Sequence, residues 1–226
     1  MKIFLIRHGE QEYPYDEQGK KLVCGFDAPL VELGREQIRE VGGKLTEERQ
    51  TLDAIYTSPI LRARQSTEVL AQELEMANTY VVDDLQENFP NSAEGHTYEE
   101  LEAIGGDIYD HPFSSNQESL NHLVERTRDA IKFILSDAKQ RGFRSVGIVG
   151  HGDPLCAFDW SLKHEDNPTS YSEMKDAYYP QKGQALEYTI SDDEPFKLIG
   201  EGRLITTEAA KSSIETFRNS SQKEAE

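Results

Sequence analysis

Two stretches of sequence decide the fold: residues 2–10 read KIFLIRHGE, and residues 145–153 read SVGIVGHGD. Each begins with a short run of apolar residues, many of them β-branched, which predicts a buried strand. Each run leads into a histidine followed by glycine, with His8 in the first stretch and His151 in the second. Glycine after the histidine suits a tight turn and lets a ligand approach the backbone closely. The pattern therefore indicates that two strands deliver a histidine to equivalent places.

Further apolar runs extend this prediction to a whole sheet. We expect strands at Lys2–Ile6, Ala54–Tyr56, Thr79–Val82 and Ser145–Val149, with a more polar pair near residues 186–190 and 196–199. Apolar residues at helical spacing predict helices over residues 30–45 and 120–138. Strands that alternate with helices predict an α/β fold, here a single three-layer domain with a mostly parallel central sheet and helices on both faces. We assign it residues 1–205 and expect residues 206–226 to form a polar C-terminal helix or tail.

A third element of interest follows the predicted strand at residues 54–56. Ser58 is a good helix cap and Pro59 a good first helical residue, so we expect a helix to start there and to carry Arg62 in or just after its first turn. A cation near a helix N-terminus loses up to ~1 kcal/mol of the stabilisation that an acid would gain there. An anion bound beside Arg62 would offset that loss.

Residues that follow the predicted strands form a small cluster that includes positively charged side chains. In sheets of this kind the ligand site lies beyond the carboxyl ends of the strands, where Arg7, His8, Arg62 and His151 all fall. Phosphate is the expected ligand of this cluster. Arginine offers forked donors to phosphoryl oxygens, and a neutral imidazole can attack phosphorus.

The overall charge narrows the range of partners. The 226 residues include 24 Lys and Arg against 42 Asp and Glu, a net charge of −18, which disfavours nucleic acids and anionic membrane surfaces as partners. The apolar run before Arg7 is too short for a signal sequence or a membrane span, so we expect a cytoplasmic protein. Cys24 and Cys156 stand far apart and predict neither a disulfide framework nor a thiolate metal site. The remaining histidines lack metal-ligand spacing, so no metal centre is expected.

Taken in order, the motifs resemble those of the histidine phosphatase superfamily, whose fold is named after phosphoglycerate mutase. The resemblance rests on RHG at residues 7–9, TSPILRARQ at residues 57–65 and GHG at residues 150–152. Residues 25–37, GFDAPLVELGREQ, are similar to a further element of the family. Together these motifs span roughly residues 3–190.

The resemblance implies a mechanism without metal or cofactor. A phosphoryl group would pass to His8, while Arg7, Arg62 and His151 hold its oxygens, and water would then hydrolyse the phosphohistidine. The substrate would be a small phosphorylated metabolite or a phosphoprotein. One branch of the family places a glutamate in a Leu-x-Glu segment after the third strand to protonate the leaving oxygen.

Glu87 fits that Leu-x-Glu segment and is the candidate general acid. Asp153 is the weaker candidate, because Gly152 separates it from His151. We interpret Asp153 as a helix cap before Pro154.

Two alternatives to a phosphomonoesterase stay open: a bisphosphoglycerate-dependent phosphoglycerate mutase, and a catalytically weak phospholigand-binding regulator of the same fold. Residues 65–125 contain no lysine or arginine, whereas mutases carry a basic clamp in this region, so the sequence favours the phosphatase. A clamp could come only from Lys20, Lys21, Lys163 or Lys182, or weakly from His96 and His111. The aromatic residues of the same segment could line a leaving-group pocket or belong to the core: Phe89, Tyr98, Tyr109 and Phe113.

Overall fold

The computed structural model describes residues 1–88, 92–193 and 195–210. Its strands are β1 (Lys2–Arg7), β2 (Ala54–Thr57), β3 (Thr79–Val81), β4 (Ser145–Gly150), β5 (Ala185–Ile190) and β6 (Leu198–Ile205). Its helices are α1 (Glu32–Glu47), α2 (Leu61–Glu73), α3 (Tyr98–Ala103), α4 (Leu120–Arg141), α5 (Gly152–Lys163) and α6 (Tyr171–Ala177), with a single 3₁₀ turn, η1 (Asp83–Leu85).

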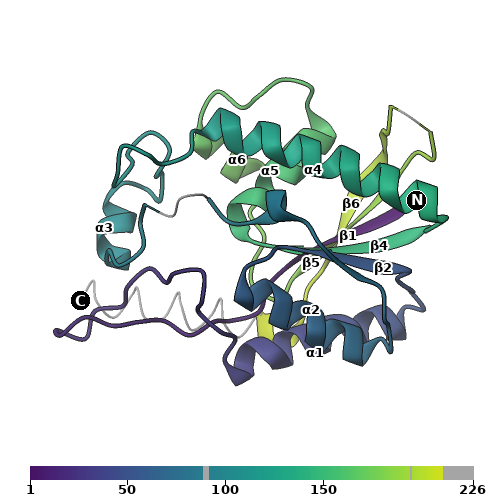
Figure 1. Cartoon of the computed structure of the whole chain (residues 1–226), viewed down its shortest axis with the longest axis horizontal. Helices are drawn as coiled ribbons and strands as arrows, with labels where there is room; N and C mark the ends of the chain where they lie inside the picture. Colours follow the sequence, from purple (N-terminus) through teal and green to yellow (C-terminus); the bar gives the residue numbers. More distant parts are fainter. Residues whose placement is uncertain (89–91, 194, 211–226) are drawn as a thin grey trace.

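The strands form one sheet in the order β3-β2-β4-β1-β5-β6. The first four are mutually parallel, whereas β5 runs antiparallel to β1 and β6 antiparallel to β5. Figure 1 shows α1 and α2 on one face of this sheet and α4 and α5 on the other. The predicted three-layer α/β fold with a mostly parallel sheet is therefore confirmed.

Strand β1 shows why its sequence is a continuous apolar run. Ile3 and Leu5 pack into the core cluster on the α4 and α5 side, while Phe4 and Ile6 pack into the cluster on the α1 and α2 side. Because side chains alternate between the two faces of a strand and both faces are covered, the four inner positions of this central strand are all apolar, and its polar residues stand only at its two ends.

The last strand is longer than the sequence indicates, since β6 runs from Leu198 to Ile205 rather than over residues 196–199. It is an edge strand whose residues are mostly exposed, so polar and apolar side chains mix along it. Such a strand lacks the apolar signal by which the central strands are recognised.

The carboxyl ends of the parallel strands bring their following loops together. The backbone N–H of His8 donates to the carbonyl of Gly150 at 3.0 Å, and that of Ser58 donates to the carbonyl of Val149 at 3.0 Å. These bonds continue the ladder beyond the ends of β1 and β2. They place the residues that follow β1, β2 and β4 at one edge of the sheet, as expected.

The described part of the predicted C-terminal tail is attached to the domain. The hydroxyl of Thr207 donates to the carbonyl of Gly183 at 3.3 Å, and the N–H of Ala209 donates to Glu40 at 3.0 Å. Residues 211–226 lie outside the described residues, so the boundary at residue 205 stays a prediction. Among the described residues, no helix combines the length and apolar character needed to cross a bilayer.

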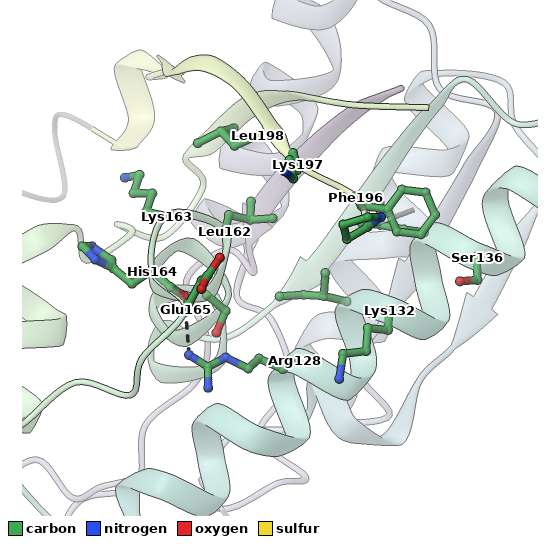
Figure 2. A pocket seen from close by; sticks show the side chains of 14 residues that line it. Arg128, Lys132, Ser136, Leu162, Lys163, His164, Glu165, Phe196, Lys197 and Leu198 are labelled. Atoms are coloured by element: carbon green, nitrogen blue, oxygen red, sulfur yellow. Dashed lines mark hydrogen bonds between the residues drawn. The ribbon is translucent and has the colours of Figure 1, made fainter. Parts of the chain in front are cut away.

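A cavity of about 900 Å³ opens between α4, the end of α5 and the start of β6 (Figure 2). Its lining includes Arg128, Lys132, Lys163 and Lys197, a local group of cations on an acidic protein. None of the residues expected to bind phosphate lines it. This cavity is therefore separate from the candidate site.

Candidate active site

His8 directly follows β1 and presents a neutral, unprotonated ring nitrogen. Its Nδ1 lies 2.7 Å from the carbonyl of Gly9, and because a carbonyl only accepts, Nδ1 carries the proton. Arg62 donates from Nε to Nε2 of His8 at 3.3 Å, which requires a lone pair on that nitrogen. Burial, and then the charge of Arg62, hold the pKa of His8 well below its usual value. His8 therefore has the protonation state of a nucleophile.

The start of α2 differs from the prediction. Ser58 is not its cap and Pro59 is not its first residue, because the helix begins at Leu61. The hydroxyl of Ser58 instead lies 2.8 Å from Nε2 of His151 and holds that ring in place. Arg62 still falls in the first turn, as expected, and is buried.

His151 and Arg7 are the other two residues of the predicted phosphate site, and each has a buried nitrogen atom without a hydrogen-bond partner in the described part of the chain. The rings of His8 and His151 lie 5.1 Å apart, and burial, followed by the charge of Arg62, lowers the pKa of His151 well below its usual value. Nδ1 of His151 and Nε of Arg7 are buried and find no hydrogen-bond partner among the described residues. Buried polar atoms are seldom left so, and the oxygens of a bound phosphoryl group would satisfy them.

The glycines beside the two histidines have a packing role that the sequence did not indicate. A Cβ on Gly9 would lie 2.1 Å from the carbonyl oxygen of Gly34 at the start of α1. A Cβ on Gly152 would lie 2.2 Å from the hydroxyl of Tyr179. In both places neighbouring protein atoms fill the space that a side chain would need.

Glu87 lies in the loop after η1, and a buried arginine of α4 holds that loop. Arg126 donates to the carbonyls of Asp84 (2.7 Å), Gln86 (2.9 Å) and Glu87 (3.2 Å). The same guanidinium makes two bonds of 2.7 Å to the carboxylate of Glu118. Arg126 therefore fixes the backbone that carries Glu87.

Sequence reasoning missed Arg126, although its position carried a signal. It lies on the apolar stripe of α4, with Leu123, Thr127 and Ala130 buried around it. A cation within a buried stripe needs partners, and here they come from a loop about 40 residues earlier.

We expect Arg126→Ala to lower the free energy of unfolding by about 3 kcal/mol or more, because it takes two hydrogen bonds from the buried carboxylate of Glu118 and removes the donor to three backbone carbonyls. Urea denaturation measures this change. Arg141→Ala on the same helix is the control, since Arg141 is exposed and a surface ion pair such as its pair with Asp137 contributes little to stability. Similar losses in the two variants would show that Arg126 does not anchor the loop.

The side chain of Glu87 is half-buried among the charged groups of the site. Burial, and then the charge of Asp153, raise its pKa to about 7, although Arg62 and Arg7 act in the opposite direction. A glutamate with this pKa is able both to give and to take a proton near neutral pH.

Asp153 is not the helix cap that the sequence suggested, because His151 occupies the N-cap position of α5 and Asp153 lies in the first turn. Its carboxylate accepts hydrogen bonds from the hydroxyls of Tyr109 (2.7 Å), Tyr171 (2.9 Å) and Tyr179 (3.1 Å). We call these four residues the Asp153 cluster.

Two of the lysines considered as a clamp lie near the site. Lys182 donates to Glu10 at 2.9 Å, contacts the Tyr13 hydroxyl and is one of the charges that lower the pKa of His8. Burial lowers the pKa of Lys182 itself to about 8. The ammonium of Lys21 lies 3.3 Å from the centre of the Tyr13 ring.

The other clamp and pocket candidates have different partners. Lys20 pairs with Glu99 and Lys163 with Asp159. The Tyr98 ring packs edge-on against Tyr13 at 5.7 Å, Tyr109 belongs to the Asp153 cluster, and Phe113 stacks on His96 at 4.1 Å. Phe89 lies outside the described residues.

Cys24 and Cys156 are both buried, and they are not joined in a disulfide. Over residues 1–88, 92–193 and 195–210, no three His, Cys, Asp or Glu side chains are gathered as a metal centre would require.

Comparisons with known proteins agree with the motifs. A family model described as the histidine phosphatase superfamily (branch 1) matches residues 3–173. The chain is 24% identical over 170 residues to a broad-specificity phosphatase of Saccharomyces cerevisiae, covering 74% of this chain and 72% of the relative. It is 27% identical over 164 residues to a 2,3-bisphosphoglycerate-dependent phosphoglycerate mutase of Parvibaculum lavamentivorans, covering 68% of this chain and 75% of the mutase. The solved structure of mycobacterial hydrolase 2 has a TM-score of 0.69 at 19% identity, covering 92% of this chain and 91% of that one, and shows the same fold.

Proposed function

The chain belongs to the histidine phosphatase superfamily, and from this premise we propose that it is a metal-independent phosphomonoesterase that works through a phosphohistidine on His8. One observation carries the proposal: the neutral ring of His8 keeps its Nε2 lone pair beside the guanidinium of Arg62. A nucleophile and a phosphate-binding cation are thereby placed together. Its phosphatase relatives support the same class of reaction.

In the first step, Nε2 of His8 attacks phosphorus and the bond from phosphorus to the ester oxygen breaks. Protonated Glu87 gives its proton to that oxygen, so the alcohol leaves neutral. Arg7 and Arg62 donate to the phosphoryl oxygens, and His151 offers its unpartnered Nδ1 there. Donors fixed in advance stabilise the charge that shifts onto these oxygens in the transition state.

In the second step, water attacks the phosphohistidine. The Glu87 carboxylate takes a proton from that water, the bond from nitrogen to phosphorus breaks, and inorganic phosphate leaves. His8 returns to its neutral state and Glu87 to its acid form. The two guanidinium groups supply the positive charge that a metal ion provides in other phosphoryl-transfer enzymes, so the proposed steps need none.

We propose small phosphorylated metabolites or phosphoproteins as substrates. The regulator alternative is disfavoured, because a binding module has no need of a neutral nucleophile and a proton donor whose pKa lies near 7. The mutase alternative gains one specific observation: Lys182 is close enough to His8 to lower its pKa, and Lys21 lies against the same Tyr13 ring as Lys182, so the two could hold a second anionic group.

We expect phosphate release to exceed the interconversion of 2- and 3-phosphoglycerate, since water rather than a second hydroxyl acid should take the phosphoryl group. A coupled interconversion assay primed with the bisphosphate, run beside phosphate release in excess chelator, measures both rates. Interconversion that outruns release by ~100-fold would identify a mutase, because enzymes favour whichever acceptor they hold in line. Loss of all activity in chelator, restored by metal, would overturn the metal-independent mechanism.

A further inference from the structure

The cavity shown in Figure 2 has the size of a small-molecule site and is separate from the residues of the proposed mechanism. Its volume of about 900 Å³ lies within the roughly 300–1,000 Å³ that ligand pockets occupy. Its wall comes from α4, from the end of α5 with the turn after it, and from the residues that lead into β6. The fold thus builds this hollow from three separate segments of the chain.

One part of the cavity wall is apolar. Leu162, Phe196 and Leu198 are half-buried and pack against the core cluster on the α4 and α5 side. Ile131 and Leu135, which also line the cavity, belong to that cluster. An apolar group that covers this surface removes it from water, which is favourable. The wall therefore fits an apolar ring or chain.

Charged side chains surround the same cavity. The carboxylate of Glu165 lines it together with four cations: Arg128, Lys132, Lys163 and Lys197. Lys132 pairs with Asp129 at 3.3 Å, and Lys163 pairs with Asp159 at 2.8 Å. These two lysines therefore already have acidic partners.

Arg128 and Lys197 differ from the two paired lysines. The Arg128 guanidinium donates to the side-chain oxygen of Asn167 at 2.5 Å and to the carbonyl of Asp166 at 2.9 Å, and both acceptors are neutral. Over residues 1–88, 92–193 and 195–210, no carboxylate forms an ion pair with Arg128 or Lys197. The hydroxyl of Ser161, on the same wall, is buried and has no hydrogen-bond partner among those residues. In a protein of net charge −18, two such cations beside an apolar wall form a local site for an anion.

We propose that this cavity binds an organic anion, a molecule that joins an apolar ring or chain to an anionic group. The apolar part lies against Leu162, Phe196 and Leu198, and the anionic group meets Arg128 and Lys197. A site with an apolar wall and a few polar groups that fix orientation is the usual construction of a small-molecule site. The inference goes beyond the proposed function and does not depend on it.

The test is the binding of two fluorescent probes that share an aromatic body. Anilinonaphthalene sulfonate carries an anionic group, whereas phenylnaphthylamine has none. We expect the double variant Lys132→Gln/Lys197→Gln to bind the sulfonate about tenfold more weakly than the wild type does, and to bind the amine equally well. Both lysines are exposed, so the substitutions leave the core intact.

Lys139→Gln is the matched control, because Lys139 is also an exposed lysine of α4 but pairs with Asp193 and does not line the cavity. It should bind both probes as the wild type does. Equal affinity for the sulfonate in the wild type and the double variant would overturn the proposal, and so would an equal loss in Lys139→Gln.

A bulky substitution locates the bound probe. Ser136 is exposed on α4 and lines the cavity, so Ser136→Trp should fill part of the hollow and weaken the binding of both probes. Unchanged affinity for both would place the probes elsewhere on the protein and overturn the proposal.

The salt dependence in the wild-type protein gives a further test that needs no variant. Added sodium chloride should weaken the binding of the sulfonate, because it screens the attraction of the cavity cations. Adsorption elsewhere on this acidic protein should instead strengthen with salt, because the repulsion between like charges is screened. Strengthening would therefore overturn the proposal. All of these measurements are made without turnover, so their outcome is independent of whether the protein releases phosphate.

Discussion

His8→Ala is expected to abolish covalent capture of phosphate and to reduce phosphate release by ~10⁴-fold or more, the scale seen when a catalytic nucleophile is removed. The reason is geometric. His8 alone in this site has a ring nitrogen with a lone pair held by a neighbouring guanidinium, whereas Nε2 of His151 is occupied by Ser58. Three of the other histidines have partners elsewhere: His96 stacks on Phe113, His122 lies beside Glu118 and His164 stacks on Trp160.

Rapid mixing with a radiolabelled phosphate ester, followed by an alkaline quench, measures the capture directly. The wild-type protein should retain label that is lost in acid, as phosphohistidine is. His164→Ala is the control, because His164 is exposed, stacks on Trp160 and lines the separate cavity of Figure 2. Label that persists unchanged in His8→Ala would assign the nucleophile elsewhere.

Glu87→Gln is expected to cost ~10²-fold or more in kcat/KM for an alkyl phosphate and little for an aryl phosphate. An alkoxide leaves only with a proton, whereas a phenolate leaves readily without one. The aryl ester thus serves as the control within the same variant, because it reports the state of His8 and the arginines. Equal losses for both esters would move the acid role away from Glu87.

The pH dependence in the wild type has a definite sign. With its pKa near 7, Glu87 is protonated below that pH and ionised above it. His8 stays neutral throughout this range, since its pKa is well below the usual value. Phosphorylation of His8 by an alkyl phosphate should therefore weaken as pH rises through 7, and this limb should be absent in Glu87→Gln.

The parts of the site that the sequence predicts are those encoded locally. His8 and His151 each follow an apolar run that forms a central strand, so the ends of β1 and β4 could be recognised from a few neighbouring residues. Arg62 lies in the first turn of its helix for the same reason, and the structure brings it to His8.

The parts that the sequence missed depend on partners far along the chain. The hydroxyl of Ser58 could cap a helix or hold a histidine, and a contact 93 residues away decides for the histidine. From the sequence alone, Asp153 is likewise interpreted as a helix cap. In the structure its carboxylate accepts a hydrogen bond from Tyr109, which lies 44 residues earlier in the chain. Hydrogen bonds of this kind leave no periodic trace in a single sequence.

The close approach of Gly9 and Gly34 also limits how this protein can be stabilised by design. Replacing a glycine within a helix by alanine ordinarily gains about 0.5–1 kcal/mol. At Gly34 the new methyl group would meet the carbonyl oxygen of Glu10 at 2.1 Å and push on the loop that carries His8. At Gly43, on the same helix, a methyl group meets nothing within 4 Å. Two glycines nine positions apart on α1 thus differ: Gly43 has room for a side chain, whereas Gly34 must stay glycine to keep the loop of the proposed nucleophile, His8, in place.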